Sequence, residues 1–132
     1  MSHKTSHGNS SAEDVNLARV LVNKGLAQFG DSLLNFAYSK ALTETTGKPM
    51  GTKVADKVLA EAAVKSGLRK LLPRRVGRGE VANGLEALLG YSFLEKRISL
   101  DEVVSCLKDV TNMIPSENFA RLAELALARS RE

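Results

Sequence analysis

Two acidic side chains stand alone in apolar stretches of the sequence. Residues 25–39 contain one charged residue, Asp31, and residues 81–94 contain one, Glu86. A carboxylate in an apolar helix is costly to bury unless it is hydrogen-bonded, paired or bound to a metal ion. The two residues are therefore candidate ligands of a divalent cation. The alternative is that each carboxylate lies at the edge of its helix and reaches water.

The basic residues are concentrated in one segment. Residues 65–78 hold six of them and no acid, and the whole chain carries 19 basic and 15 acidic residues, so this segment accounts for the entire net charge of +4. Pro73, Gly77 and Gly79 favour a loop here, and Arg suits bidentate contacts with phosphate. The segment is either a solvated loop or a nucleic-acid contact. The candidate contacts are Arg69, Lys70, Arg74, Arg75 and Arg78.

Apolar residues at helical spacing predict an all-α chain, a compact bundle of about six helices. Thr52 and Ser116 are expected to cap helices, and Ser99 with Glu102 forms a capping box. Residues 1–11 are polar and predict a mobile tail before a single domain over 12–132. The predicted helices and one short turn span 12–24, 26–45, 53–66, 68–72 (the turn), 80–96, 100–113 and 117–129.

The composition excludes several classes of protein. The single cysteine, Cys106, excludes an intrachain disulfide framework and a Cys-rich zinc site. Aromatic residues make up 5% of the chain, which argues against a platform for stacking single-stranded bases. No apolar run approaches the ~20 residues that span a bilayer. The start lacks the apolar core of a signal peptide, so we expect a cytoplasmic protein without a membrane partner.

Glycines accompany both lone acids. Gly25 and Gly30 lie near Asp31, while Gly84 and Gly90 flank Glu86. A glycine inside a helix costs about 1 kcal/mol relative to alanine, so it often marks a close approach of two backbones. We expect these glycines to let the two helices pass close together, which would bring the two carboxylates side by side.

The same segments resemble the ribonuclease III family. Residues 26–34 (LAQFGDSLL) are similar to the family's first acidic motif, and residues 85–90 (LEALLG) are similar to its second. Between them, residues 66–72 and 78–80 resemble the connecting region in order and spacing. The resemblance covers about residues 15–105 and implies the all-helical fold of the endonuclease domain.

The chain departs from the family at two of its four usual acidic positions. Asp31 and Glu86 match one acid of each motif, whereas Ala27 and Asn83 stand where the other two would fall. The short Mini-ribonuclease III branch, which lacks a double-stranded RNA-binding domain, is more similar. Residues 84–91 (GLEALLGY) are very close to its second motif.

The resemblance implies an Mg²⁺-dependent hydrolase of double-stranded or structured RNA that acts as a homodimer, with a possible role in rRNA maturation. Asp31 and Glu86 would be catalytic and hold the cation, Asn83 would contact it through water, and Mn²⁺ could substitute. Mg²⁺ needs only one or two protein carboxylates, so one well-held cation is expected. The candidate residues of the dimer interface are Leu33, Leu34, Phe36 and Ala37. The alternative is that these apolar residues belong to the core of the monomer.

Two other functions remain open. Loss of two acids is the pattern that a non-catalytic relative would show, serving as an RNA-binding or ribosome-associated scaffold. An unrelated helical interaction module would require both motif matches to arise by chance.

Overall fold

The computed structural model describes residues 16–108 and 114–130, which form helices and connecting segments with no strand among them. Residues 16–21 are helical. They are followed by α2 (Lys24–Thr46), α3 (Asp56–Ser66), a 3₁₀ turn η1 (Leu68–Leu71), α4 (Arg78–Leu94), α5 (Leu100–Lys108) and α6 (Pro115–Ser130). The predicted all-α class is confirmed. The predicted tail and the end of the predicted 100–113 helix lie outside the described residues.

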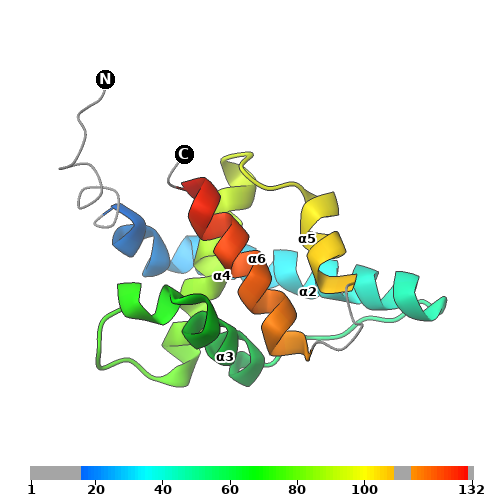
Figure 1. Cartoon of the computed structure of the whole chain (residues 1–132), viewed down its shortest axis with the longest axis horizontal. Coiled ribbons are helices and arrows are strands. Elements are labelled where there is room, and N and C mark those ends of the chain that lie inside the picture. The colour runs from blue at the N-terminus through cyan, green and yellow to red at the C-terminus, as the bar shows by residue number, and fades with distance from the viewer. Residues whose placement is uncertain (1–15, 109–113, 131–132) are drawn as a thin grey trace.

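Helix α4 is the central element of the bundle. Its residues are buried on nearly every side because α2, α3 and α6 all pack against it. Figure 1 shows α6 crossing in front of α4, while α2 passes on its other side. An apolar helix of this kind is stable only when neighbouring helices cover its whole circumference. No helix of the described ranges is long and apolar enough to cross a membrane.

Local sequence signals set most of the helix ends. The Asn23 side chain accepts a hydrogen bond from the Leu26 N–H (2.9 Å) and caps α2. At the other end, Gly47 adopts the left-handed conformation (φ +76°) that terminates α-helices without a steric penalty. The predicted capping box is confirmed, since Ser99 and Glu102 exchange side-chain hydrogen bonds with each other's backbone N–H.

The prediction that Thr52 caps a helix beginning at residue 53 is wrong. Helix α3 begins three residues later, at Asp56. The Thr52 N–H and carbonyl both bond to the Ser39 hydroxyl of α2 (2.9 and 3.1 Å). Because these long-range bonds satisfy its backbone, the chain around Thr52 is held against α2 and does not enter the helix.

The predicted cap at Ser116 is also wrong. Helix α6 begins at Pro115, and a proline suits the first position of a helix because its missing N–H would have no partner there. The Ser116 hydroxyl instead accepts a hydrogen bond from the Lys65 ammonium (3.0 Å), which links α6 to α3.

The candidate dimer residues divide between core and surface. Leu33, Leu34 and Ala37 are buried within the chain itself, at 8%, 0% and 0% exposure, so they belong to its core. Phe36 is 57% exposed.

Candidate metal and RNA-binding site

Helices α2 and α4 approach most closely at two glycines. A Cβ atom added at Gly30 would lie 1.8 Å from the Glu86 carbonyl oxygen, and one added at Gly90 would lie 2.7 Å from the Leu26 carbonyl oxygen. Both distances are far below van der Waals contact. The expected close approach is therefore confirmed at these two positions. Gly84 has a different role, because a Cβ added there would lie about 3.0 Å from the Leu72 side chain and not against α2.

This close approach places the two lone carboxylates together. Asp31 directly follows Gly30 and is half-buried, while Glu86 is only 5% exposed. Burial is the largest cause that raises the pKa of Glu86 to about 8. The Asp31 carboxyl within hydrogen-bonding reach and the negative charges of Asp31 and Asp56 raise that pKa further, while Lys53 lowers it. Near neutral pH, Glu86 therefore holds a proton beside Asp31.

Asn35 fixes the position of Asp31. Its amide nitrogen donates to Asp31 Oδ1 (3.0 Å), and its amide oxygen accepts from the Val54 N–H (2.8 Å). The residue thus ties the carboxylate to the segment that leads into α3. This link was not predicted from the sequence. The four-residue spacing from Asp31 was the available signal, since residues i and i+4 are neighbours on a helix.

An open pocket brings all three predicted metal-site residues together. Asp31, Glu86 and Asn83 share it with residues from two other stretches of the sequence, 24–28 and 53–56. Lys24, Lys53 and Asp56 were not predicted, because no local pattern links the beginnings of α2 and α3 to the apolar motifs. The full lining is Lys24, Ala27, Gln28, Asp31, Lys53, Asp56, Asn83 and Glu86.

The donor set fits a hard divalent cation bound mainly through water. Within residues 16–108 and 114–130, no three His, Cys, Asp or Glu side chains lie close enough together to form a complete metal cage. Mg²⁺ does not need one, because it keeps several waters and uses one or two carboxylates. Asp31 and Glu86 provide that number.

The basic segment is divided among several elements, as the predicted 53–66 helix and 68–72 turn imply for Lys65, Arg69 and Lys70, but Arg78 lies in a helix and not in the expected loop. Lys65 lies in α3, Arg69 and Lys70 lie in η1, and Arg78 is the first residue of α4. Only Arg74 and Arg75 lie in the connecting loop, where both are exposed. Glycine and proline mark the ends of helices as readily as loops, which explains the error.

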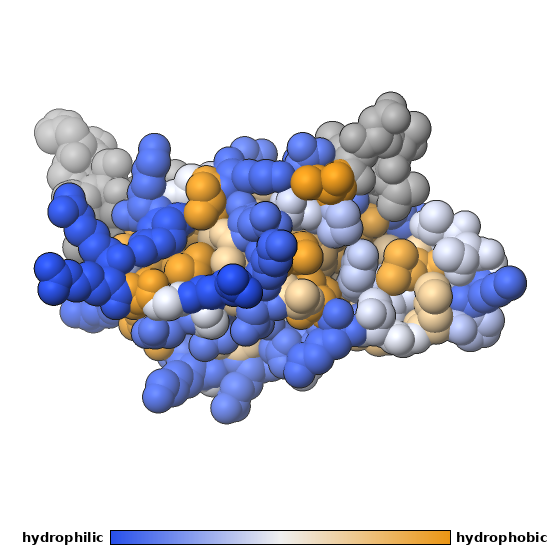
Figure 2. Space-filling view, turned by 90° about the horizontal axis from the view of Figure 1, so that it is seen from below, coloured by the Kyte–Doolittle hydropathy of each residue, from blue (hydrophilic) through white to orange (hydrophobic). Residues whose placement is uncertain are grey.

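Arg69 holds this loop in one shape. Its guanidinium donates to the Pro73 carbonyl (2.9 Å) and to the Arg74 carbonyl (2.7 Å). Lys70, Arg74, Arg75 and Arg78 are exposed and make no side-chain hydrogen bond or ion pair within the described parts of the chain. Figure 2 shows several of the most hydrophilic side chains toward its left-hand end, the end at which Figure 1 places residues 68–78.

The fold and the site together define an all-helical domain in which a carboxylate pair lies at the crossing of two glycine-spaced helices. A family model described as Ribonuclease III matches residues 24–129, which span both of these helices and the rest of the bundle. The chain therefore belongs to the ribonuclease III family. A search of curated proteins finds no match.

The pKa of Glu86 predicts how stability depends on pH without a divalent cation. Because its folded-state pKa of about 8 exceeds the ordinary 4.5, the folded protein binds this proton more tightly than the unfolded chain. The free energy of unfolding should fall as pH rises from about 5 to 8, by up to about 1 kcal/mol per pH unit. Urea unfolding at several pH values measures this slope. The slope of unfolding free energy against pH should disappear in Glu86→Gln and decrease when Mg²⁺ is added to the wild type. An unchanged slope in the variant would contradict the raised pKa of Glu86.

Proposed function

We propose that this protein is an Mg²⁺-dependent endoribonuclease that hydrolyses double-stranded or structured RNA. The observation that carries the proposal is the pairing of the half-buried Asp31 with the buried Glu86 in an open pocket that Lys24 and Lys53 also line. A phosphodiester is an anion, and two carboxylates would repel it without a cation between them. The pair therefore suits the attack of water on a phosphate held by a bound cation.

Each residue of the pocket has a distinct task in this proposal. Asp31 and Glu86 hold the cation, and Asn35 keeps Asp31 in position through its hydrogen bond. The cation supplies a water of lowered pKa and neutralises charge on the leaving oxygen. Asn83 orients a water through its amide oxygen but adds no charge. Ala27 and Asn83 provide no carboxylate, and Asp56 is the one other acid of the pocket lining, so the pocket would hold one cation, either Mg²⁺ or Mn²⁺.

Duplex RNA is recognised mostly through its shape and backbone. In this proposal Lys70, Arg74, Arg75 and Arg78 contact phosphates, and Arg69 contributes by holding the loop that presents Arg74 and Arg75. The exposure of these cations and the scarcity of aromatic residues support backbone contacts over base stacking. The proposed role is in RNA processing, such as rRNA maturation, and the proposed location is the cytoplasm.

Replacing Arg74, Arg75 and Arg78 together by Gln should weaken RNA binding and make it less sensitive to salt. Removing one phosphate-binding cation lowers the slope of log affinity against log salt by about 0.9 in duplex nucleic acid, so the slope should fall by about 2–3. Binding titrations from low to moderate salt, without a divalent cation, measure this. Replacing Lys48, Lys57 and Lys96 by Gln removes the same charge elsewhere, and an equal decrease in slope there would contradict the assignment.

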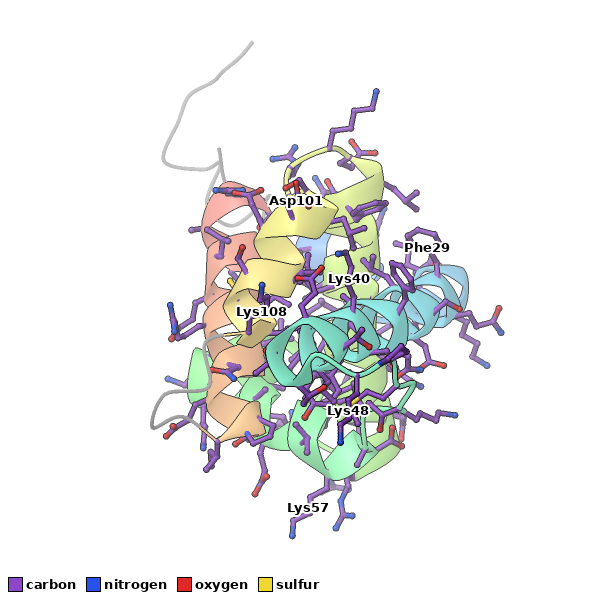
Figure 3. The ribbon with its side chains drawn as sticks, turned by 90° about the vertical axis from the view of Figure 1, so that its right-hand side faces the viewer. Phe29, Lys40, Lys48, Lys57, Asp101 and Lys108 are labelled. Carbon is purple, nitrogen blue, oxygen red and sulfur yellow. The ribbon has the colours of Figure 1, made fainter. Side chains whose placement is uncertain are left out.

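A homodimer would place two pockets on one duplex, one for each strand. Phe29 and Phe36 lie seven residues apart on one side of α2, at 37% and 57% exposure, and Phe29 packs against Phe93 of α4. Figure 3 shows Phe29 projecting from α2 on the side away from α6. We propose this apolar surface as the contact between two copies.

Sedimentation of Phe36→Glu tests the dimer. A charge buried at an interface without a partner costs several kcal/mol, so the dissociation constant should rise at least about a hundredfold. Val64→Glu, which alters an equally exposed apolar residue of α3, should sediment like the wild type. A wild-type protein that sediments as a monomer at all concentrations would contradict the proposal.

The scaffold function is the second candidate, because Ala27 and Asn83 leave the pocket with half of the family's usual acids. Incubating the protein with long duplex RNA in Mg²⁺, Mn²⁺ or EDTA separates the two. Cation-dependent cleavage supports the nuclease, and tight binding without cleavage in any cation supports the scaffold.

A further inference from the structure

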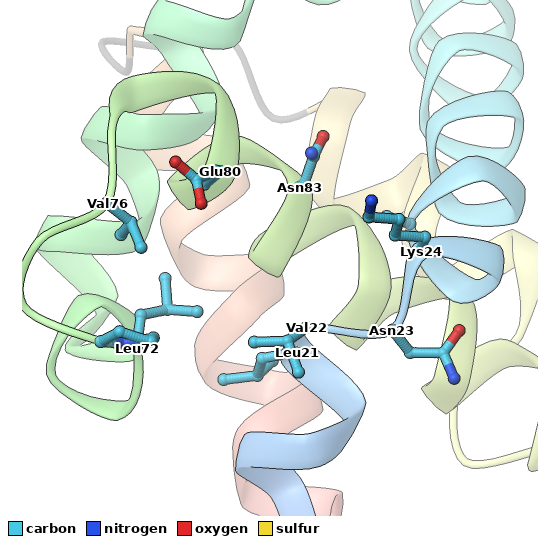
Figure 4. Close-up of a pocket in the computed structure, with 10 residues that line it drawn as sticks. Leu21, Val22, Asn23, Lys24, Leu72, Val76, Glu80 and Asn83 are labelled. Atoms are coloured by element: carbon cyan, nitrogen blue, oxygen red, sulfur yellow. The ribbon is translucent and has the colours of Figure 1, made fainter.

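A second cleft adjoins the carboxylate pocket. It lies between the turn that precedes α2, the loop that follows η1 and the first turns of α4, as Figure 4 shows. Its volume is about 160 Å³, and a cavity of about 150 Å³ is large enough to accommodate benzene. Most of its wall is apolar and is formed by Leu21, Val22, Leu72, Pro73 and Val76.

The cleft lies between the two features that the proposed function assigns to RNA. Lys24, Ala27 and Asn83 line both this cleft and the carboxylate pocket. On its other side, Pro73 and Val76 flank the exposed Arg74 and Arg75 in the sequence. An RNA strand that contacts the carboxylate pair and these arginines must therefore pass over the cleft.

The chemistry of the cleft suits a nucleobase. Its aliphatic wall can cover the face of a flat ring, while amide groups at its rim can hydrogen-bond to the ring's polar edge. Asn83 and Lys24 line the side of the cleft that it shares with the carboxylate pocket, and Lys24 can pair there with an adjoining phosphate (Figure 4). Glu80 is the one acidic side chain of the lining, and it already accepts a hydrogen bond from the Gly77 N–H (3.2 Å).

We propose that this cleft binds the base of an unpaired nucleotide next to the phosphate that is cleaved. A base inside a duplex is stacked and paired, whereas an unpaired base can turn out into a protein pocket at low cost. This proposal rests on the proposed function and adds to it that the preferred RNA carries a bulge or an unpaired end beside the cleavage position.

A titration with a free nucleotide tests the cleft without any cleavage. Adenosine and cytidine 5′-monophosphate are added to ¹⁵N-labelled protein, and the backbone amide signals are followed. In the wild type we expect shifts at Lys24, Val76 and Asn83. Val22→Phe should weaken binding at least about tenfold, because the added ring fills the cleft.

Val64→Phe is the matched control, since Val64 is 63% exposed, Val22 is 59% exposed, and only Val22 lines the cleft. Both variants should unfold at the same temperature. The absence of shifts in the wild type, or equal binding by the two variants, would overturn the proposal.

A cleavage assay then tests whether the base that occupies the cleft comes from the RNA substrate. A duplex with one unpaired nucleotide should be cut at least about tenfold faster than its fully paired equivalent, and Val22→Phe alone should abolish this preference. A preference that survives in Val22→Phe overturns the proposal. If the wild type cuts neither RNA, the proposed function fails, and the nucleotide titration still decides whether the cleft binds a base.

Discussion

Replacing Glu86 by Gln is expected to lower cation-dependent RNA cleavage by about 10²–10⁴-fold, since metal stabilisation of the reacting charges contributes several kcal/mol and each 1.36 kcal/mol is a factor of ten. The amide keeps the shape of the side chain and can still donate a hydrogen bond to Asp31. It removes only the negative charge that would hold the cation. Initial rates on a labelled duplex, at saturating RNA and several Mg²⁺ concentrations, measure the effect.

The same variant should gain stability at pH 9 without a divalent cation. The wild type must then keep an ionised carboxylate at a position that is only 5% exposed and beside Asp31, whereas Gln stays neutral. Reduced activity together with increased stability distinguishes the removal of a cation ligand from general unfolding. Asp101→Asn, an exposed acid on α5, should change neither property. Equal cleavage by wild type and Glu86→Gln would locate the activity elsewhere.

Replacing Gly30 by Ala is expected to lower the free energy of unfolding by about 4 kcal/mol or more, at the upper end of single-residue effects. The new Cβ would lie 1.8 Å from the Glu86 carbonyl oxygen. The backbone fixes the positions of both atoms, so no side-chain rotation can relieve the clash. Helix α2 would have to move off α4. The intrinsic helix preference for alanine, about 1 kcal/mol, opposes this loss but is too small to offset it. Chemical denaturation measures the change.

Gly25→Ala provides the control on the same helix. Gly25 is exposed, and a Cβ there would meet its nearest neighbour, Asn23 Oδ1, at 3.4 Å. That distance is ordinary contact, so the free energy of unfolding should change by less than about 1 kcal/mol. A destabilisation equal to that of Gly30→Ala would mean that the close approach of α2 and α4 at Gly30 is not the cause of the loss.

Local patterns predicted the elements of this protein well. Helical spacing of apolar residues identified every described helix, because that spacing reflects which side of each helix faces the core. The isolation of Asp31 and Glu86 among apolar residues marked the candidate site, since a charge is rare in such surroundings without a partner. The glycines beside them indicated the crossing that brings the two together, and the structure confirms it at Gly30 and Gly90.

Features that depend on a choice between competing hydrogen-bond partners escaped prediction. Thr52 has the chemistry of a helix cap, but its backbone bonds to Ser39, thirteen residues earlier, and the helix starts later as a result. Arg69 has the chemistry of a phosphate ligand, but its guanidinium holds the Pro73 and Arg74 carbonyls. When a polar group has several possible hydrogen-bond partners, the folded structure decides which partner lies close enough to bond, and the sequence alone does not.

The composition of the pocket shows the same division most clearly. Each residue of the carboxylate pair belongs to a short sequence motif that can be recognised without the other. Lys53 and Asp56 join that pair only because the segment that leads into α3 is held against α2, where Asn35 accepts a hydrogen bond from the Val54 N–H. Burial and these neighbours then set the pKa of Glu86, which no motif encodes. Local sequence thus specified the two carboxylates, and tertiary packing decided their surroundings, because electrostatic energy depends on distances through space.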